Sequence, residues 1–553
     1  MKKALKKNSF IQGTLVASIS LILIKILGAL YVIPFYKIIG EDGGTLYSYA
    51  YNIYNLFLNI STAGIPIAIS MIVSEYMALE MYDAKERSRK VATKIVLFLA
   101  AISFCIVFFG SDILARFLLS DVSGGHSIAD VSLVIKSISF CLIIIPFLSI
   151  LRGYLQGHKF ISPTSFSELI EQIVRIIVVL GGSYISLKLL KMNVKYGVCI
   201  SLSGAFFGGI CAYIYLYLKV KNNKEAFPKS KKKDNVKDST LIKKIFTYAI
   251  PIIMISIIDN LYTIVDIKLI VKGLTMVGFS AINAQTVSSI VATWAPKICT
   301  IMIAISMALT TNIIPHVTSS YIKKDYASVN KRINQALSTM LIITIPMATL
   351  LFLLSNEAYY IFYESSAYGS LILKASSISH IFFGLWTVLN SSLQSMKKFK
   401  IIYLNAIVGL ATNAMLDIPM ILLFNHLHIA PFIATVVCTA IGYIVSICIV
   451  LIYLNKHMKF NYKETFKLLE KLIIPVLFII IPIALSKHYI KFEYTRITSF
   501  ISLFIHGIYG VVIYFIITYK NGALKDVFSE ELINNILKKL HLIKEEGLWI
   551  KLY

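Results

Sequence analysis

The sequence predicts an all-α membrane protein with fourteen transmembrane helices, and composition is the first reason. The chain has 553 residues, of which 57% are hydrophobic, and its mean hydropathy is +0.76. Charged residues make up 15%, against about 25% in ordinary soluble domains. Apolar runs of about 20 residues, long enough to cross a bilayer, recur along the whole chain. These observations exclude a disordered chain and argue against a water-soluble enzyme.

The apolar runs form two sets of seven. The first set covers residues 10–39, 45–79, 91–119, 128–150, 165–190, 195–219 and 241–270. The second covers 283–313, 334–354, 371–396, 399–424, 429–454, 471–490 and 497–519. No cleavage site follows the first run, so it is expected to be a retained helix.

Positive charge gives the expected orientation. With the N-terminus inside, the inner segments and their adjoining helix ends hold 39 of the 54 Lys and Arg residues, and the outer ones hold 11. This asymmetry predicts that both termini are cytoplasmic. The weak points are six cations that this orientation places outside, namely Lys188, Lys191, Lys195, Lys487, Lys491 and Arg496.

The net charge of +26 would suggest nucleic acid in a soluble protein. Here the basic residues lie in short loops between apolar runs, which favours anionic membrane lipids as partners and excludes nucleic acid. The seven cysteines lie within apolar runs and none forms a CxxC pair, so neither a metal framework nor a disulfide framework is expected.

A weak internal repeat suggests a duplicated half. Ile60, Ser61, Ala63, Ser74 and Tyr76 recur 245 residues later, and Leu151, Leu155, Gln156 and Lys159 recur 238 residues later. We therefore divide the chain into an N-lobe (1–219, helices one to six), a basic cytoplasmic linker (220–240) and a C-lobe (241–455, helices seven to twelve). Helices thirteen and fourteen (456–520) and an amphipathic cytoplasmic tail (521–553) follow.

The sequence lacks the common catalytic motifs. It contains no GxxxxGK[ST] loop, so ATP hydrolysis is not expected, and no HExxH or GxSxG. The loops are short, which leaves little room for an extramembrane active site. The sequence therefore favours a transporter over an enzyme such as a membrane polymerase.

Ionisable groups within the apolar runs are the candidate site residues, because each costs about 2.5–3.5 kcal/mol in hydrocarbon. Lys25 lies in the middle of the first helix, and Lys297 follows Pro296 in the eighth. If these helices face each other, the two ammonium groups form a cationic site for a phosphate-bearing substrate. The alternative is that each lysine snorkels or pairs with a carboxylate.

Two further groups of polar residues lie at helical spacing. Glu171 and Arg175 are four residues apart in the fifth helix, which predicts an ion pair with a structural or gating role. Asn413 and Asp417 share the same spacing in the eleventh helix, and Asp266 lies in the seventh. Their oxygens could coordinate a hard cation such as Na⁺, relay protons or pair with a lysine. The tyrosine-rich start of the second helix is expected in the outer aromatic belt, with cavity lining as the alternative.

Several strings resemble one known family. The segment Leu151–Arg175 contains the pattern RGxxQGxxxxxPTxxSxxxEQxxR, Tyr51–Pro66 resembles a second-helix signature, and Lys25–Gly28 resembles a first-helix RILG. The chain thus resembles the MurJ-like lipid II flippases of the YtgP/SpoVB type, in the multidrug/oligosaccharidyl-lipid/polysaccharide exporter superfamily. This resemblance covers essentially the whole chain.

The resemblance implies fourteen helices, with two six-helix lobes in a V around a central cationic cavity, and alternating access. It places a family arginine at Lys25, which keeps the charge but loses the bidentate fork. A second family arginine falls at Tyr31, so that contact is absent, and a third falls at or beside Lys297. It also implies a Na⁺ site built from Asp266, Asn413 and Asp417.

We therefore expect a flippase in the bacterial cytoplasmic membrane, which moves a polyprenyl-pyrophosphate-linked cell-wall precursor, first of all lipid II, to the outer leaflet. The alternatives are a flippase for a teichoic, capsular or spore-cortex intermediate, and a multidrug antiporter. No cofactor is expected except Na⁺ as a coupling ion, and contact with the cell-wall synthesis machinery is a further expectation. The expected substrate-binding residues are Lys25, Lys297, Arg152 and Asn52, and the expected structural or gating residues are Glu171, Arg175 and Gln156.

Overall fold

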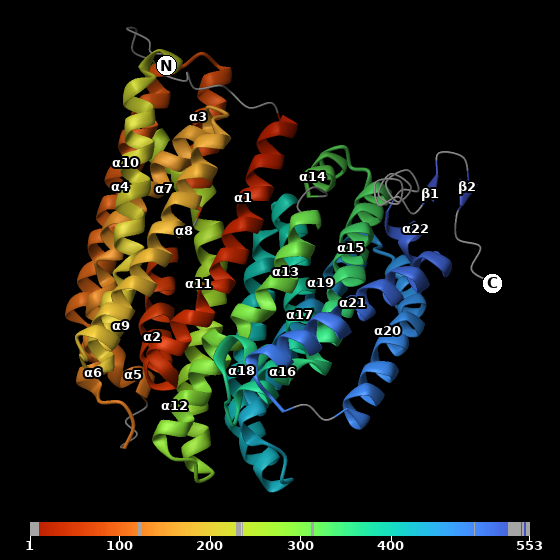
Figure 1. The fold of residues 1–553 in the computed structure, drawn as a ribbon. Coiled ribbons are helices and arrows are strands. Elements are labelled where there is room, and N and C mark those ends of the chain that lie inside the picture. Colours follow the sequence, from red (N-terminus) through yellow and green to blue (C-terminus); the bar gives the residue numbers. More distant parts are fainter. Residues whose placement is uncertain are drawn as a thin grey trace. The chain divides into compact units, whose positions relative to one another are not determined.

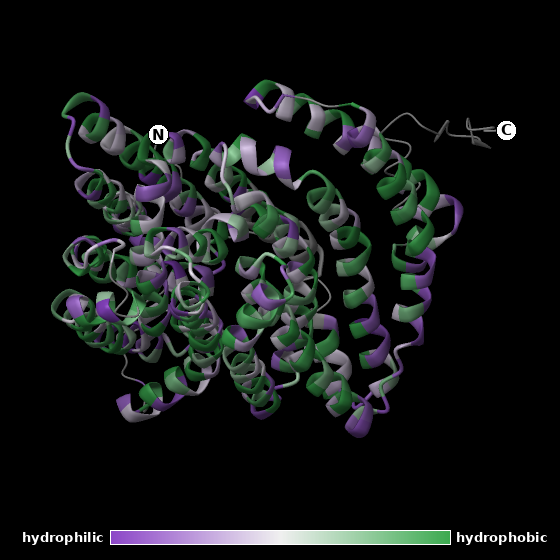
Figure 2. Ribbon diagram, turned by 90° about the horizontal axis from the view of Figure 1, so that it is seen from below, coloured by the Kyte–Doolittle hydropathy of each residue, from purple (hydrophilic) through white to green (hydrophobic). Residues whose placement is uncertain are grey.

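The computed structural model confirms an all-α membrane fold. It describes residues 10–62, 64–119, 124–227, 234, 236–310, 314–490, 493–528, 543–544 and 547–548. Within these residues, 13 helical segments are long and apolar enough to cross a membrane. Apolar residues dominate the helices in Figure 2, and many large apolar side chains are exposed, as expected for helices that face lipid.

The chain packs into two compact units, residues 1–298 with 410–439 and residues 299–409 with 440–553. The first unit contains the helices that end before residue 295, together with the short η4 (Figure 1). They are α1 (Phe10–Leu30), α2 (Val32–Thr62), α3 (Ile65–Ala78), α4 (Tyr82–Phe109), α5 (Ser111–Leu119), α6 (Ile128–Ser139), α7 (Cys141–Gly157), α8 (Ile161–Tyr184), η1 (Ile185–Leu189), α9 (Val194–Leu202), α10 (Gly204–Asn222), η2 (Lys224–Ala226), α11 (Asp238–Met276), α12 (Ala281–Ser289), η3 (Ile290–Trp294) and η4 (Pro431–Ile433).

Three helices run from one unit into the other, and the rest belong to the second unit. The shared helices are α13 (Ala295–Thr310), α18 (Phe399–His426) and α19 (Ala434–Met458). The second unit contains α14 (Ile314–Ile322), α15 (Tyr326–Leu353), α16 (Ser355–Tyr363), α17 (Gly369–Ser395), α20 (Lys463–Tyr489), α21 (Arg496–Lys520), α22 (Ala523–Val527) and the paired strands β1 (Ile543–Lys544) and β2 (Gly547–Leu548).

Helix boundaries near the N-terminus follow two glycines. Gly40 has φ 69° and kinks α2, and it falls in the gap between the first two predicted runs. Gly64 has φ 77° and precedes α3, so the second predicted run is divided into two helices. The total of fourteen spans stays a prediction, because α1 is not among the 13 segments. The division into lobes also stays a prediction, and most of the predicted tail lies outside the described residues.

Turn geometry is consistent with the internal repeat. Lys159 and Lys397, which are 238 residues apart, both adopt positive φ, of 66° and 57°. Each donates its backbone N–H over 2.9 Å to the carbonyl of an equivalent glutamine, Gln156 or Gln394. The two turns agree with the repeat, and the same helix-ending turn with positive φ also occurs at Lys324 and His428, so it is not specific to the repeat.

The signature glycines of the segment Leu151–Arg175 pack helices. A Cβ at Gly153 would lie 2.5 Å from the Pro66 carbonyl oxygen, and one at Gly157 would lie 2.7 Å from Val73 Cβ. Because small residues four apart let helix backbones approach, α7 fits closely against α3. These two helices contribute to the apolar core of the first unit. This packing fixes the end of α7 that carries Arg152.

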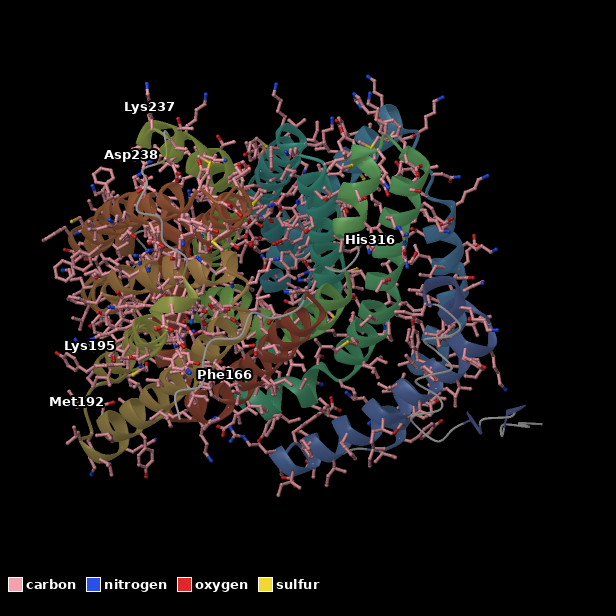
Figure 3. The ribbon with its side chains drawn as sticks, turned by 90° about the horizontal axis from the view of Figure 1, so that it is seen from above. Phe166, Met192, Lys195, Lys237, Asp238 and His316 are labelled. Atoms are coloured by element: carbon pink, nitrogen blue, oxygen red, sulfur yellow. The ribbon has the colours of Figure 1, made fainter. Side chains whose placement is uncertain are left out.

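Three of the six cations that weakened the predicted orientation have acidic partners. Lys195, labelled in Figure 3 near the start of α9, lies 2.8 Å from Asp130. Lys487 lies 2.9 Å from Glu357, which is buried in the second unit. Arg496 lies 2.9 Å from a glutamate of the α16–α17 loop. These neutralised cations therefore weigh less against the predicted orientation than the raw count suggests.

Candidate functional site

Lys297 lies in an aromatic cage of the first unit. Its Nζ is 4.2 Å from the ring centroid of Trp294, 5.0 Å from that of Tyr47 and 5.6 Å from that of Tyr51. The π-helical turn η3 ends at Trp294, directly before Ala295 and Pro296, so the helix deforms at the predicted proline. Cation–π contacts with three rings stabilise an ammonium group inside a membrane protein.

Lys25 is the other intramembrane lysine of the predicted site, and its side chain is exposed. It is the single charged residue of α1. One turn further along, Gly28 brings α1 close to α8, because a Cβ there would lie 3.4 Å from Gln172 Nε2. Lys25 and Lys297 both belong to the first unit. Their joint action on one substrate stays a prediction.

Arg152, Glu171 and Arg175 form one network between α7 and α8. Arg152 Nη2 lies 3.0 Å from Glu171 Oε2, and its Nε and Nη2 donate hydrogen bonds of 3.0 and 2.8 Å to Ser167 Oγ. The other oxygen of Glu171 accepts a hydrogen bond from Arg175, as the spacing predicted. Arg152 is therefore held by protein groups, while its predicted contact with substrate stays a prediction.

Asn52 belongs to a ladder of polar contacts between α2 and the α12–η3 segment. Its Nδ2 donates to Thr293 Oγ1 over 2.9 Å, and the hydroxyls of Ser48 and Thr293 lie 2.6 Å apart. Thr45 donates to Ser289 over 3.3 Å one turn away. Ser48 and Thr293 are 245 residues apart, which is the offset of the first predicted repeat.

The prediction that the tyrosine-rich start of the second helix lies in the outer aromatic belt is wrong. Tyr47, Tyr49 and Tyr54 of α2 are 4%, 0% and 4% exposed, so these rings face the interior of the first unit. Tyr47 contacts Trp294 at a centroid distance of 5.8 Å and stacks on Tyr51 at 5.6 Å. The alternation of tyrosine with apolar residues cannot separate a lipid-facing helix from a buried one, because both are apolar.

Gln156 lies at the end of α7 and acts through its backbone carbonyl, which accepts the N–H of Lys159. This contact is structural, and the gating role of the glutamine side chain stays a prediction.

A second polar cluster joins α11, α18 and α19. Asn413 Nδ2 donates to Asp266 Oδ1 over 2.5 Å, and Thr439 donates to Asp266 Oδ2 over 3.0 Å. Asp266 is 5% exposed, and Asn413 and Asp417 are fully buried. The Asn413 amide oxygen and both Asp417 oxygens are buried, without an N–H or O–H donor in hydrogen-bonding geometry among the described residues.

This cluster fits a small hard cation. Two buried carboxylates repel each other unless a proton or a cation neutralises them. The oxygens of Asn413 and Asp417 receive no N–H or O–H donor among the described residues, and Thr439 adds a hydroxyl, so the cluster offers the oxygen ligands that such an ion needs. The Cys438 thiol lies within hydrogen-bonding reach of Asp417. Among the described residues no group of three or more His, Cys, Asp or Glu side chains is placed to hold a metal ion.

Sequence reasoning missed four contributors, namely Trp294, Ser167, Thr293 and Thr439. Trp294 had a signal, because it precedes Lys297 by three residues and therefore shares its helical face. Ser167 also had a signal, because it is the serine of the pattern quoted for Leu151–Arg175. Thr293 and Thr439 are common hydroxyl residues, and only the packing of their helices brings them to the site.

The fold and these sites define a multi-pass membrane protein of the transporter type. The sequence profile of the family described as polysaccharide biosynthesis protein matches residues 10–298, and the chain belongs to this family. Its curated relatives include the lipid II flippase MurJ of Bacillus subtilis, which is 29% identical over 97% of this chain and 99% of the relative. Stage V sporulation protein B of the same organism is 22% identical over 73% of this chain and 76% of the relative.

Solved structures show the same fold. The lipid II flippase MurJ in an inward closed conformation superposes with a TM-score of 0.65 at 19% identity, over 94% of this chain and 100% of that one. An inward-facing multidrug resistance transporter of the MATE family in the MOP superfamily gives a TM-score of 0.62 at 11% identity, over 81% and 98%. At these identities the structures establish fold alone.

Proposed function

We propose that this protein is a flippase that moves a polyprenyl-pyrophosphate-linked cell-wall precursor across the bacterial cytoplasmic membrane, with lipid II as the leading candidate substrate. The observation that carries the proposal is Lys25, an exposed ammonium in the last third of an otherwise uncharged helix. Such a charge is costly in hydrocarbon, so it calls for water or an anionic ligand. The full-length similarity to a lipid II flippase supplies the ligand, a pyrophosphate.

Lys297 would supply the second positive charge. Its contacts with Trp294, Tyr47 and Tyr51 are weak individually, about 0.5–2 kcal/mol each. A pyrophosphate offers a far stronger charge-assisted hydrogen bond, so the lysine could exchange ring contacts for phosphate contacts during the transport cycle. An inside-negative potential then favours outward movement of the anionic headgroup by about 2.3 kcal/mol per charge per 100 mV.

We also propose Na⁺ as the coupling ion, bound by Asp266, Asn413, Asp417 and Thr439. The support is the set of buried oxygens without donors in this cluster. A bound Na⁺ would neutralise the two carboxylates. Its binding would thereby tie α11 to α18 and α19, which gives the ion a route to influence the conformation of the first unit.

The direct test is to deplete the protein in a strain without a second flippase and measure lipid II at the outer leaflet against the total pool. Wild type should restore the outer pool, and Lys25→Gln and Lys297→Gln should not, although they reach wild-type levels in the membrane. Lys188→Gln is the matched control, because it removes an exposed lysine outside these sites. An unchanged outer pool on depletion would remove lipid II as the substrate.

A different lipid-linked glycan is the second candidate, and the match to the family described as polysaccharide biosynthesis protein, a description that names no single glycan, favours it. The same assay separates the two, because a cell that keeps its outer lipid II on depletion would lose another exported glycan instead. A multidrug antiporter has only likeness of fold in its favour. Its cationic substrates would be repelled by Lys25 and Lys297.

A further inference from the structure

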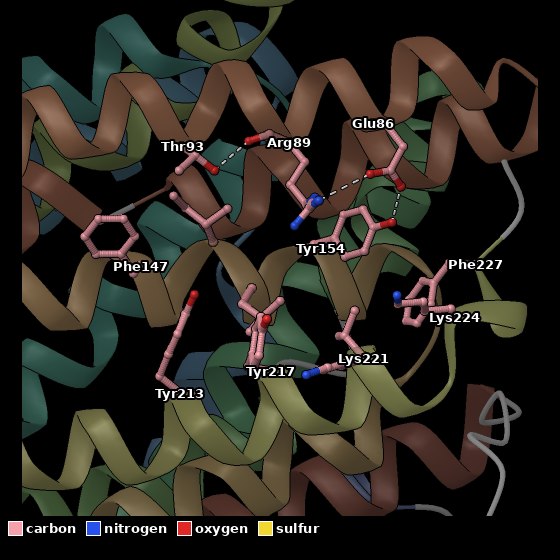
Figure 4. A pocket seen from close by; sticks show the side chains of 13 residues that line it. Glu86, Arg89, Thr93, Phe147, Tyr154, Tyr213, Tyr217, Lys221, Lys224 and Phe227 are labelled. Carbon is pink, nitrogen blue, oxygen red and sulfur yellow. Dashed lines mark hydrogen bonds and ion pairs between the residues drawn. The ribbon is translucent and has the colours of Figure 1, made fainter. Parts of the chain in front are cut away.

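A cavity of about 460 Å³ lies between α4, α7 and α10, away from the lysines and the polar clusters described above (Figure 4). Glu86 and Arg89 of the first turns of α4 line it, together with Tyr154 near the end of α7. Lys221, in the last turn of α10, and Lys224 lie at the same end. The cavity therefore opens where three helices meet the polar edge of the membrane.

The charge of this cavity is positive. Its single carboxylate, Glu86, is already engaged, because it accepts a hydrogen bond from the Tyr154 hydroxyl and lies 3.3 Å from Lys85 and 3.5 Å from Arg89. Lys221 and Lys224 are exposed, so their ammonium groups are accessible. The Arg89 Nε–H is buried without an acceptor among the described residues. An anion would satisfy these donors.

The other end of the cavity is apolar and aromatic. Phe147 lines it from α7, two turns before Tyr154, and Thr93 lines it from α4, two turns after Glu86. Seven residues of α-helix correspond to about 10 Å, so the cavity extends from the membrane surface into hydrocarbon depth. Tyr213 and Tyr217 of α10 stack on each other at a centroid distance of 6.3 Å and form a flat wall.

We propose that this cavity binds an anionic phospholipid of the inner leaflet. Its phosphate would contact Lys221, Lys224 and Arg89, and one acyl chain would lie along Phe147 and the Tyr213–Tyr217 wall. A cationic mouth above an apolar slot about 10 Å deep matches the amphipathic shape of a phospholipid, whereas a soluble phosphate would leave the slot unfilled. The predicted orientation places this end at the cytoplasmic leaflet, where anionic lipids attract basic residues.

The test is native mass spectrometry of the delipidated full-length protein, titrated with phosphatidylglycerol or phosphatidylcholine. Wild type should bind one phosphatidylglycerol tightly and phosphatidylcholine much more weakly. Lys221→Gln/Lys224→Gln should bind phosphatidylglycerol about thirtyfold more weakly, since each interfacial lysine contributes about fivefold. Lys188→Gln/Lys191→Gln is the matched control, because it removes two exposed lysines elsewhere and should bind like wild type.

Three results would overturn the proposal. Equal phosphatidylglycerol affinity of wild type and the Lys221/Lys224 variant would remove the lysines from the site. Equal affinity for phosphatidylcholine would show that charge does not select the lipid. Displacement of the lipid by glycerol phosphate at equal concentration would identify a soluble phosphate ligand instead. The four exchanged lysines are exposed, so each variant is expected to fold.

Discussion

Replacement of Arg152 by Gln separates a structural role from contact with substrate. In the structure Arg152 makes two hydrogen bonds to Ser167 and one ion pair with Glu171, and its side chain is 15% exposed. Removing one partner of a buried ion pair costs about 3–5 kcal/mol. Arg175 still neutralises Glu171 after the substitution, which favours the lower end of this range. We therefore expect a fall of several degrees in apparent Tm.

The assay pairs thermal unfolding of the detergent-solubilised protein with flipping per folded molecule. Arg152→Gln should lower Tm and keep the flipping rate of the molecules that remain folded. Lys25→Gln should do the reverse, because the exposed Lys25 side chain contributes little packing. Arg152→Lys, which keeps the charge and loses the fork, should lie between wild type and Arg152→Gln in Tm. Wild-type Tm with lost flipping in Arg152→Gln would refute the reasoning and place Arg152 at the substrate.

Three further predictions concern other parts of the chain. Asp417→Asn should abolish the rise in Tm that Na⁺ gives over K⁺, and a retained rise would exclude the proposed cation site. Lys487→Met should lower Tm, because it leaves the Glu357 carboxylate buried without its ion-pair partner. The double variant with Glu357→Gln should recover much of the lost Tm. Additive losses in the two single variants and the double variant would show that the pair is not coupled. Burial holds the pKa of His126 below its usual value, although Asp42 lies 3.3 Å away and raises it. Because the unfolded chain then binds the proton more readily, stability should fall as the pH drops below about 6.5, and His126→Gln should reduce that fall in a Tm series from pH 7.5 to 5.

Local spacing predicted what a single helix determines. Glu171 and Arg175 are four residues apart, so their ion pair followed from helical geometry alone. The addition of Arg152 depended on how α7 folds back on α8, and no pattern in the sequence records that contact. Hydropathy also located the helices from local sequence, because a membrane span requires only that its own residues are apolar.

Contacts between helices that are distant in the chain could not be derived from local sequence patterns. Asp266 and Asn413 are 147 residues apart. Their residue types left a shared cation site as one of several alternatives, and the family resemblance made it an expectation. The burial of Tyr47 was missed, because an apolar helix carries no sign of which face meets lipid and which meets protein. The Trp294 ring under Lys297 could have been found from its spacing, although not the tyrosines that complete the cage.

If the internal repeat records a duplication, the contact between Ser48 and Thr293 joins the same position in both copies. In a symmetric dimer of identical halves, a two-fold axis would pass through this point, and each substitution would change both sides at once. Two halves within one chain are free of that constraint, and here the two sides differ by a methyl group. A transporter must pass its cargo in one direction, and a contact that can vary on one side alone is the simplest place for such a polarity to arise.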